Sequence, residues 1–137
     1  MTYVDPEWET MKAWAAGFID GEGCIHCGVS HGQPRIKLMV GQVDQRPLQK
    51  LSEMFGGAIV LHAKAKGNSR ESWRWQVQGR TAQKILKDLM PYLVSKIDEA
   101  KLALEFDCGK DGHKPEDFVV QKRYEIMQQL KEMKRAV

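Results

Sequence analysis

The chain has 137 residues and a mass of 15.6 kDa, which is enough for one domain with its own apolar core, so we expect residues 1–137 to form a single domain. No apolar run approaches the roughly 20 residues that cross a bilayer, and the first residues lack the order of a signal peptide. Three cysteines, an odd number, argue against a disulfide framework and favour a reducing compartment inside the cell.

The net charge of +3 is unevenly distributed along the chain. Residues 23–80 hold nine Lys or Arg against three acids, whereas the rest of the chain holds twelve against fifteen. A solvated surface usually mixes both signs, so this basic middle segment favours a polyanionic partner. Ordinary surface lysines are the alternative explanation.

The first predicted element is a helix from about residue 6 to residue 20. Asp5 offers an N-cap acceptor and Pro6 suits the first helical position, while Gly21 and Gly23 mark the end of the helix. Small residues occupy one stripe of this helix at spacings of three and four, which lets a second helix backbone come unusually close. The stripe consists of Ala13, Ala16, Gly17, Asp20 and Gly21.

The rest of the chain shows two kinds of pattern. Four segments alternate apolar and polar residues, as strands with one solvated face do, and four segments show helical spacing. The predicted strands are 24–30, 35–40, 58–66 and 72–78, and the predicted helices are 44–55, 81–93, 96–106 and 115–135. The order α-β-β-α-β-β-α-α-α predicts an α+β fold in which helices cover one face of a four-stranded antiparallel sheet and leave the other face free.

Some details of these elements can be checked against a structure. Thr81 and Ser95 are the predicted N-caps of two helices, and Pro115 is the predicted first residue of the last helix. The residues expected to face inward are Leu61, Ala63 and Ala65 in the third strand, and Val119, Tyr124, Met127 and Leu130 in the last helix.

The segment Ala15–Gly23 resembles the signature helix of the LAGLIDADG homing endonucleases. The motif's glycine falls at Gly17, its first acid at Asp20, its second acid at Glu22 and its last glycine at Gly23. One departure is the glutamate at position 22, where aspartate is commoner. The element order is similar to that of a LAGLIDADG domain over nearly the whole chain. The resemblance implies an α-β-β-α-β-β-α core whose sheet is a DNA-binding saddle, additional C-terminal helices, and a homodimer formed through the motif helix.

Glu22 is the residue best suited to catalysis. Hard divalent cations bind oxygen ligands and assist phosphodiester cleavage, and Glu22 is a carboxylate at a helix end beside the carbonyl of Gly21. Two motif helices packed through their small stripes would bring two such carboxylates together, and bound metal relieves their repulsion. We therefore expect Mg²⁺, or Mn²⁺ in its place, at Gly21 and Glu22. The alternative for Glu22 is a solvated acid, and Asp20 is expected to hydrogen-bond across the helix pair or to a neighbouring helix end.

The resemblance also implies two residues that position and activate water. By position these are Gln42, after the second strand, and Lys96, before a later helix, so the implied catalytic set is Glu22, Gln42 and Lys96. Gln45 is a rival for the role of Gln42, and Arg46 could contact the scissile phosphate. Lys96 could also be an ordinary first-turn lysine, although the helix dipole disfavours a cation there.

Polar and basic side chains occupy the outward positions of the predicted strands. In the major groove Arg and Lys suit guanine and Gln suits adenine, a two-stranded ribbon fits the groove, and contacts to phosphate alone position the protein without reading sequence. The candidate DNA-binding residues are His26, Ser30, Arg35, Lys37, Arg46, His62, Lys64, Lys66, Asn68, Arg70, Arg74 and Gln76.

Two other interpretations compete with cleavage. Cys24 and Cys27 have the spacing of zinc ligands, but on a strand they point to opposite faces. The same fold could also serve as an intron maturase, with intron RNA as its partner, or as a non-catalytic DNA-binding protein. The resemblance favours a Mg²⁺-dependent homing endonuclease that cuts both strands of a long, pseudo-palindromic DNA site as a homodimer. It implies a location in the cytoplasm of a bacterial or phage-infected cell, or in an organelle.

Overall fold

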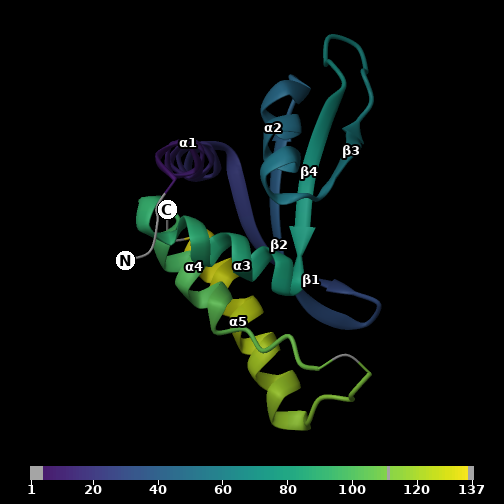
Figure 1. Cartoon of the computed structure of the whole chain (residues 1–137). Helices are drawn as coiled ribbons and strands as arrows, with labels where there is room; N and C mark the ends of the chain where they lie inside the picture. Colours follow the sequence, from purple (N-terminus) through teal and green to yellow (C-terminus); the bar gives the residue numbers. More distant parts are fainter. Residues whose placement is uncertain (1–4, 111, 136–137) are drawn as a thin grey trace.

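The computed structural model describes residues 5–110 and 112–135, and the predicted order of elements is confirmed (Figure 1). None of the helices in this described part is long and apolar enough to cross a membrane. The elements in chain order are α1 (Pro6–Glu22), β1 (Gly23–Ser30), β2 (Gln33–Gln42), α2 (Gln45–Phe55), β3 (Ala58–Ala63), β4 (Ser72–Gln78), α3 (Gly79–Leu89), the 3-10 helix η1 (Met90–Tyr92), α4 (Ile97–Leu104) and α5 (Asp117–Arg135).

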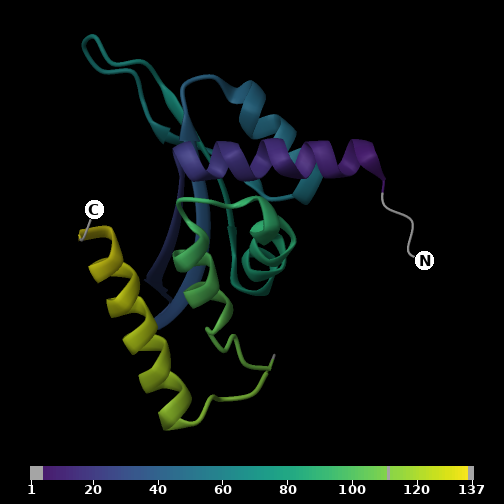
Figure 2. The same cartoon turned by 90° about the vertical axis from the view of Figure 1, so that its left-hand side faces the viewer.

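The four strands form one antiparallel sheet in the order β1-β2-β4-β3. All the helices lie on one side of this sheet, as Figures 1 and 2 show from two directions. The other side carries no helix, so the strands have a covered face and an open face. This arrangement is the α+β fold that the sequence predicts.

The core lies between the covered face of the sheet and the helices. Ile36, Leu38 and Trp75 are fully buried on the strands, and the indole Nε1 of Trp75 donates to the carbonyl oxygen of Gly56 at 2.8 Å. Gly57 follows with a φ of +97°, and a Cβ there would lie 2.6 Å from the same indole nitrogen. The glycine pair after α2 therefore lets the chain turn tightly around the largest buried side chain.

Helix α1 begins as predicted, because the side chain of Asp5 caps it. It ends two residues later than predicted, at Glu22, and so includes Gly21 within the helix. Gly23 follows in an extended conformation, with a φ of −88°. A Cβ at this position would lie 2.8 Å from the backbone oxygen of Ile19, so the glycine is required by the close approach of the chain and not by a left-handed turn.

The predicted third strand is too long at its far end. Strand β3 stops at Ala63, after an irregularity in its pairing with β4. Leu61 is 40% exposed, and Ala63 and Ala65 are exposed as well, so the prediction that these residues face the core is wrong. The reason is geometric, since the ribbon formed by β3 and β4 extends beyond the helices, which leaves its tip without a covering layer (Figure 1).

Three predicted helix starts are also wrong. Helix α3 begins at Gly79 and not at Thr81, directly after β4. Helix α4 begins at Ile97, and the hydroxyl of Ser95 donates to a backbone carbonyl of α1 instead of capping α4. Helix α5 begins at Asp117, and not at Pro115.

The inward face of α5 also differs from the prediction. Tyr124 is 41% exposed, whereas Arg123, Ile126 and Leu130 are the buried residues of this helix. The prediction is therefore confirmed for Leu130 and wrong for Tyr124, whose place in the buried stripe is taken by its neighbour Arg123. A charged residue thus lies in this stripe.

Candidate functional site

The end of α1 brings two of the predicted catalytic residues into contact. Glu22 is the last residue of the helix and is exposed, and the side-chain amide of Gln42 donates to Glu22 Oε2 at 3.1 Å. Gln42 is the last residue of β2, and it reaches Glu22 because β1 leaves α1 and pairs along β2, with Gly23 opposite Val40. The carboxylate of Glu22 is therefore oriented by the neighbouring strand. Gln45, the rival of Gln42, is the partly buried first residue of α2.

Asp20 ties the segment before α4 to the same end of α1. The backbone N–H groups of Val94 and Lys96 donate to the two oxygens of the Asp20 carboxylate at 2.8 and 3.1 Å. These amides lie just before the first residue of α4, so Asp20 holds the segment that leads into a neighbouring helix, which is one of the two roles expected for it from the sequence. With both oxygens bonded within its own chain, Asp20 has a structural role.

Lys96 lies beside the same turn of α1. Its ammonium group donates to the backbone carbonyl oxygen of Asp20 at 2.7 Å. This contact explains a lysine at a helix start, because its charge is attracted by the negative carbonyl end of α1. Glu22 ends α1 and Gln42 ends β2, and Lys96, just before α4, contacts the same last part of α1.

The donor chemistry at this point fits a hard divalent cation, although one chain supplies few ligands. A cation such as Mg²⁺ prefers six oxygen ligands, and the carboxylate of Glu22 is oxygen of the right kind. Among the residues that the structure describes, no group of three His, Cys, Asp or Glu side chains lies close enough to hold a metal. A single chain therefore offers few protein ligands to such a cation, which commonly keeps several of its waters.

The cysteines do not form the alternative zinc site. All three are free, and Cys27 is buried, which raises the pKa of its thiol to about 11. Cys24 accepts a hydrogen bond from the ammonium of Lys134 at 3.1 Å. Cys27 is thus a small core residue, and the two sulfurs have separate surroundings.

One face of α1 is exposed and carries almost no side-chain bulk. Ala13, Gly17 and Gly21 are exposed at spacings of four, and no atom of the chain lies within 4 Å of a Cβ built on either glycine. Ala16 corrects the predicted stripe, because it is fully buried against the core of its own chain. Since Asp20 is bonded to the start of α4, the free part of the stripe is Ala13, Gly17 and Gly21.

The strand register places several candidate DNA-binding residues in rows across the open face. His26 lies opposite Lys37, which lies opposite Gln78 on β4. The ring of His26 lies over Gly28, since a Cβ there would be 2.9 Å from His26 Nε2 and 4.0 Å from Lys37 Nζ. Burial first, and then Lys134, Lys37 and Lys131, lower the pKa of His26. The end of α5 therefore adds two lysines near this row that sequence analysis missed.

A second group of candidates lies where β4 passes between β2 and β3. Arg74 is opposite Gly41 on one side and Val60 on the other, and Gln76 is opposite Met39 and Ala58. The Nε of Arg74 is buried and has no hydrogen-bond partner in the chain. Small or apolar neighbours thus leave Arg74 with an unused donor on the open face.

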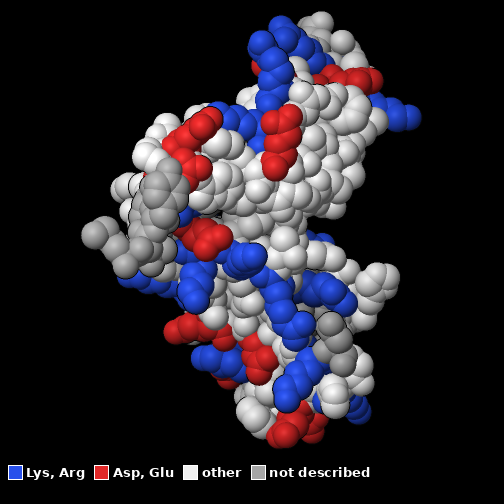
Figure 3. Space-filling model, in the orientation of Figure 1, with Lys and Arg blue, Asp and Glu red and all other residues white. Residues whose placement is uncertain are grey.

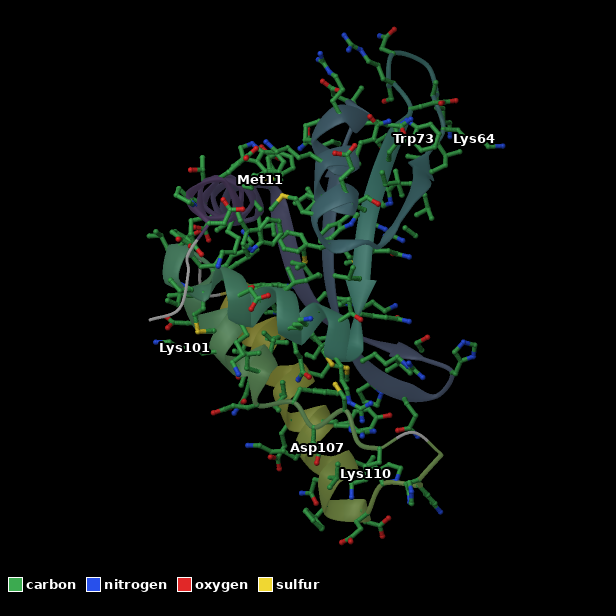
Figure 4. All side chains as sticks on the ribbon, in the orientation of Figure 1. Met11, Lys64, Trp73, Lys101, Asp107 and Lys110 are labelled. Atoms are coloured by element: carbon green, nitrogen blue, oxygen red, sulfur yellow. The ribbon has the colours of Figure 1, made fainter. Side chains whose placement is uncertain are left out.

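The remaining candidates lie at the two ends of the sheet. Lysine and arginine side chains gather over the tip of the β3–β4 ribbon (Figure 3), and Lys64 points away from the body of the molecule (Figure 4). This tip turns at Lys66 and Ser69, whose backbones bond to each other. The candidates at this end are His62, Lys64, Lys66, Asn68 and Arg70, and those at the other end are Ser30 and Arg35.

Arg46 is placed differently from the other candidates. It lies in the first turn of α2, and its guanidinium is paired with the N-cap Asp44 at 2.6 Å. The side chain of Arg46 is 86% exposed, and its hydrogen bonds lower the pKa of Asp44 to about 2. Arg46 therefore has an anionic partner already, although it is open to solvent.

Comparison with known proteins gives the family. Residues 15–102 match the family described as LAGLIDADG endonuclease. The DNA endonuclease I-CvuI of Chlorella vulgaris is 33% identical over 102 residues, which are 68% of this chain and 61% of that protein. The chain belongs to the LAGLIDADG endonuclease family, and the match spans about three fifths of the length of this relative.

Solved structures show the same fold. The homing endonuclease I-CvuI in complex with its target in the presence of Ca has a TM-score of 0.76 and 26% identity, covering 93% of this chain and 83% of that chain. A structure of I-CvuI with the I-CreI target in the presence of Mg, in which the DNA is not cleaved, has a TM-score of 0.63 and 24% identity, covering 93% and 98%. The LAGLIDADG fold inferred from the sequence is therefore confirmed.

Proposed function

We propose that this chain is a homing endonuclease that cuts both strands of a long, pseudo-palindromic DNA site as a homodimer with the help of Mg²⁺. The observation that carries the proposal is the exposed Glu22 carboxylate, which accepts a hydrogen bond from Gln42 at the end of a helix whose exposed face is bare at Gly17 and Gly21. The family supports cleavage, and I-CvuI, the relative at 33% identity, is a DNA endonuclease.

The residues at the end of α1 divide the chemical work. Glu22, together with the carbonyl of Gly21, would hold Mg²⁺, or Mn²⁺ in its place, and the ion would supply positive charge to the attacking and leaving oxygens. Gln42 fixes the orientation of the Glu22 carboxylate through its amide. Lys96 supplies a cation beside Glu22 that can stabilise charge on a phosphate.

A homodimer supplies what one chain lacks. Packing two copies of α1 through Ala13, Gly17 and Gly21 would bring the two Glu22 carboxylates to the two-fold axis, where each scissile phosphate adds oxygen ligands. The open faces of the two sheets would then lie side by side along the DNA, which requires a site with approximate two-fold symmetry.

The direct test is selection of cleaved sites from a randomised duplex library in Mg²⁺, with binding measured in Ca²⁺. We expect cut sequences that are roughly palindromic. Glu22→Gln should lower cleavage by at least about 10²-fold, because it removes a metal ligand worth several kcal/mol, and it should leave binding intact. Bound sites without any cleavage by the unaltered protein would refute the nuclease and favour a maturase or a non-catalytic DNA-binding protein.

The same assay distinguishes Gln42 from Gln45. Gln42→Ala should lower the cleavage rate, because it leaves the Glu22 carboxylate without its amide donor at 3.1 Å. Gln45→Ala is the matched control at the start of α2. A larger loss with Gln45→Ala than with Gln42→Ala would transfer the water-positioning role to Gln45.

The dimer is tested by overfilling the helix contact. Gly17→Leu should give a folded monomer, because Gly17 is exposed and no described atom beyond the adjoining part of α1 lies within 4 Å of a Cβ there. Glu7→Leu, at an exposed position in the first turn of α1, is the matched control and should leave the dimer intact. Sedimentation velocity measures both, and a dimer of unchanged stability in Gly17→Leu would refute this packing.

A further inference from the structure

A cavity away from the end of α1 has a lining that none of the roles above uses. It has a volume of about 250 Å³ and lies where the start of β2 meets the loop after α4 and the helix α5. Its described lining includes Arg35, Lys110 and Arg123, and none of its described lining residues is acidic. Lys110 lies on the loop that runs past α5 (Figure 4). We call this space the basic cavity.

Arg123 is the unusual residue of the basic cavity. Only 7% of its surface is exposed, and its guanidinium is fixed on several sides. Nε donates to the backbone oxygen of Asp107 at 2.7 Å, the group lies over the ring of Phe106 at 5.6 Å, and a Cβ on Gly109 would be 3.0 Å from Nη2. The guanidinium is therefore held in place before any ligand arrives.

Among the residues that the structure describes, no carboxylate forms an ion pair with Arg123. A buried cation without a paired anion costs several kcal/mol, and chains retain such groups chiefly where a ligand or partner supplies the charge. The lining therefore points to an anion as the missing partner.

The electrostatics of the cavity agree with this interpretation. Cys108 lies in the lining. Burial is the main cause that raises the pKa of its thiol, and the Asp107 carboxylate raises it as well, whereas the guanidiniums of Arg80, Arg123 and Arg35 lower it. Three arginines, from α3, α5 and β2, thus act on this point against the one carboxylate of Asp107. Planar guanidiniums bind phosphate oxygens in pairs of hydrogen bonds, and 250 Å³ is ample for a phosphate group and its water.

We propose that the basic cavity binds a phosphoryl group, and that this group is a backbone phosphate of the DNA outside the base pairs that the strands cover. The DNA source rests on the proposed function. It is favoured by Arg35, which lines the cavity and also occupies an outward position of β2 next to Lys37 along the open face. Arg35 thus links the cavity to the end of the open face near the β1–β2 turn.

The phosphate itself is tested first, with inorganic phosphate as the probe. Phosphate should raise the melting temperature of the unaltered protein more than chloride does at equal ionic strength. Lys110→Gln should reduce this difference, and Arg123→Met should abolish it. Lys110 is exposed, so its variant folds even if Arg123→Met is unstable. Lys114→Gln, an exposed lysine of the same loop that does not line the cavity, is the matched control. Equal shifts in all four proteins would overturn the site.

The one acid between residues 108 and 115 is Asp111, which lies outside the described residues. Replacing Asp111 provides a second check on which anion is the partner of Arg123. If a phosphoryl group is the partner of Arg123, Asp111→Asn should keep or enlarge the phosphate effect. If the effect appears only in Asp111→Asn and is absent from the unaltered protein, the carboxylate is the partner and the proposal fails.

The DNA source is tested with duplexes that carry one neutral methylphosphonate at successive positions. At one flanking position in each half-site, neutralisation should weaken binding by the unaltered protein about tenfold, the value of a charge-assisted contact. The same change should cost Lys110→Gln much less, because the contact is already weakened. Uniform effects at every position would overturn the DNA source even if free phosphate binds. Absence of DNA binding by the unaltered protein would refute the proposed function instead, and the melting experiment would then decide the cavity alone.

Discussion

The covered and open faces of the sheet are built from alternate residues of the same strands, and they have opposite tasks. On β2, Ile36, Leu38 and Val40 are buried, while Arg35 and Lys37 point the other way. The apolar side chains of the covered face pack against the helices. The charged side chains of the open face have no covering layer. Adjacent residues of one strand therefore serve different purposes, because one packs in the core and the next faces the open side.

The separation is least complete where β3 and β4 leave the helical layer. Trp75 is fully buried, whereas Leu61, on the same side of the sheet, is 40% exposed. The tip of this ribbon consequently has two solvated faces and little apolar support. Changes near the tip should affect DNA binding, and changes near the centre of the sheet should affect folding.

The largest effect is expected at the centre of the covered face. Trp75→Ala should lower the free energy of unfolding by about 3–5 kcal/mol, because it empties a large buried site and leaves the Gly56 carbonyl without its donor at 2.8 Å. Urea unfolding followed by circular dichroism measures the loss. Trp73→Ala, on the same strand but only partly buried, should cost clearly less. Equal losses would contradict the difference in burial.

A smaller effect is expected at the next residue toward the N-terminus, Arg74 on the open face, where DNA affinity should change and stability should not. Arg74→Met keeps the aliphatic stem and removes a guanidinium whose buried Nε has no partner. Its free energy of unfolding should change by less than about 0.5 kcal/mol, while its affinity for DNA should fall about tenfold. Unfolding and binding titrations on the same preparation compare the two. A loss of stability without a loss of affinity would reverse the assignment of the faces.

Much of this arrangement could be predicted from the sequence because alternation and capping are local signals. The strand at residues 72–78 was predicted at its observed bounds, Asp5 caps α1 as predicted, and the helix predicted over 44–55 is α2. Each of these depends on residues that are neighbours in the chain. The apolar period of a strand also assigns its two faces without any knowledge of the partner strand.

The errors arose where distant parts of the chain decide the outcome. Ser95 looks like an N-cap, but the start of α4 is bonded to Asp20, which is 74 to 76 residues away from its partners. Ala63 fits the alternation of an inward residue, but it is exposed because the β3–β4 ribbon extends beyond the helices. Arg123 could have been placed inward from its spacing to Ile126 and Leu130, although its charge argued against it.

The geometry at the end of α1 shows the same division. Glu22 and its glycine neighbours are a local motif, whereas the contact of Gln42 with Glu22 depends on the pairing of β1 with β2. Lys96 looked misplaced at a helix start, and only the structure shows that it bonds to the carbonyl end of another helix. Sequence identified which residues belong together, and the tertiary structure supplies the reason.

The smallest expected effect concerns a proton on the open face. Burial and three lysines lower the pKa of His26 below its usual value of 6.5, so the free protein keeps this side chain neutral near pH 7. Unfolding restores the ordinary pKa, and the associated stability is therefore present above pH 6.5 and is lost as the pH falls toward the folded value. A nearby DNA phosphate has the opposite sign to the lysines and would raise the pKa of His26.

DNA binding should therefore take up a proton at His26, and affinity should rise as the pH falls from 8 to 6. We expect about a threefold gain beyond any change shared by all variants, well within the tenfold per pH unit that one proton allows. His26→Gln should lose this gain in affinity. The control is His62→Gln, which should keep the gain, because His62 is exposed on β3, at the opposite edge of the sheet from β1. Binding titrations at constant ionic strength measure the three slopes. If His26→Gln retains the slope, then DNA does not approach the β1 edge of the open face, and the recognition surface is confined to β2, β4 and the ribbon tip.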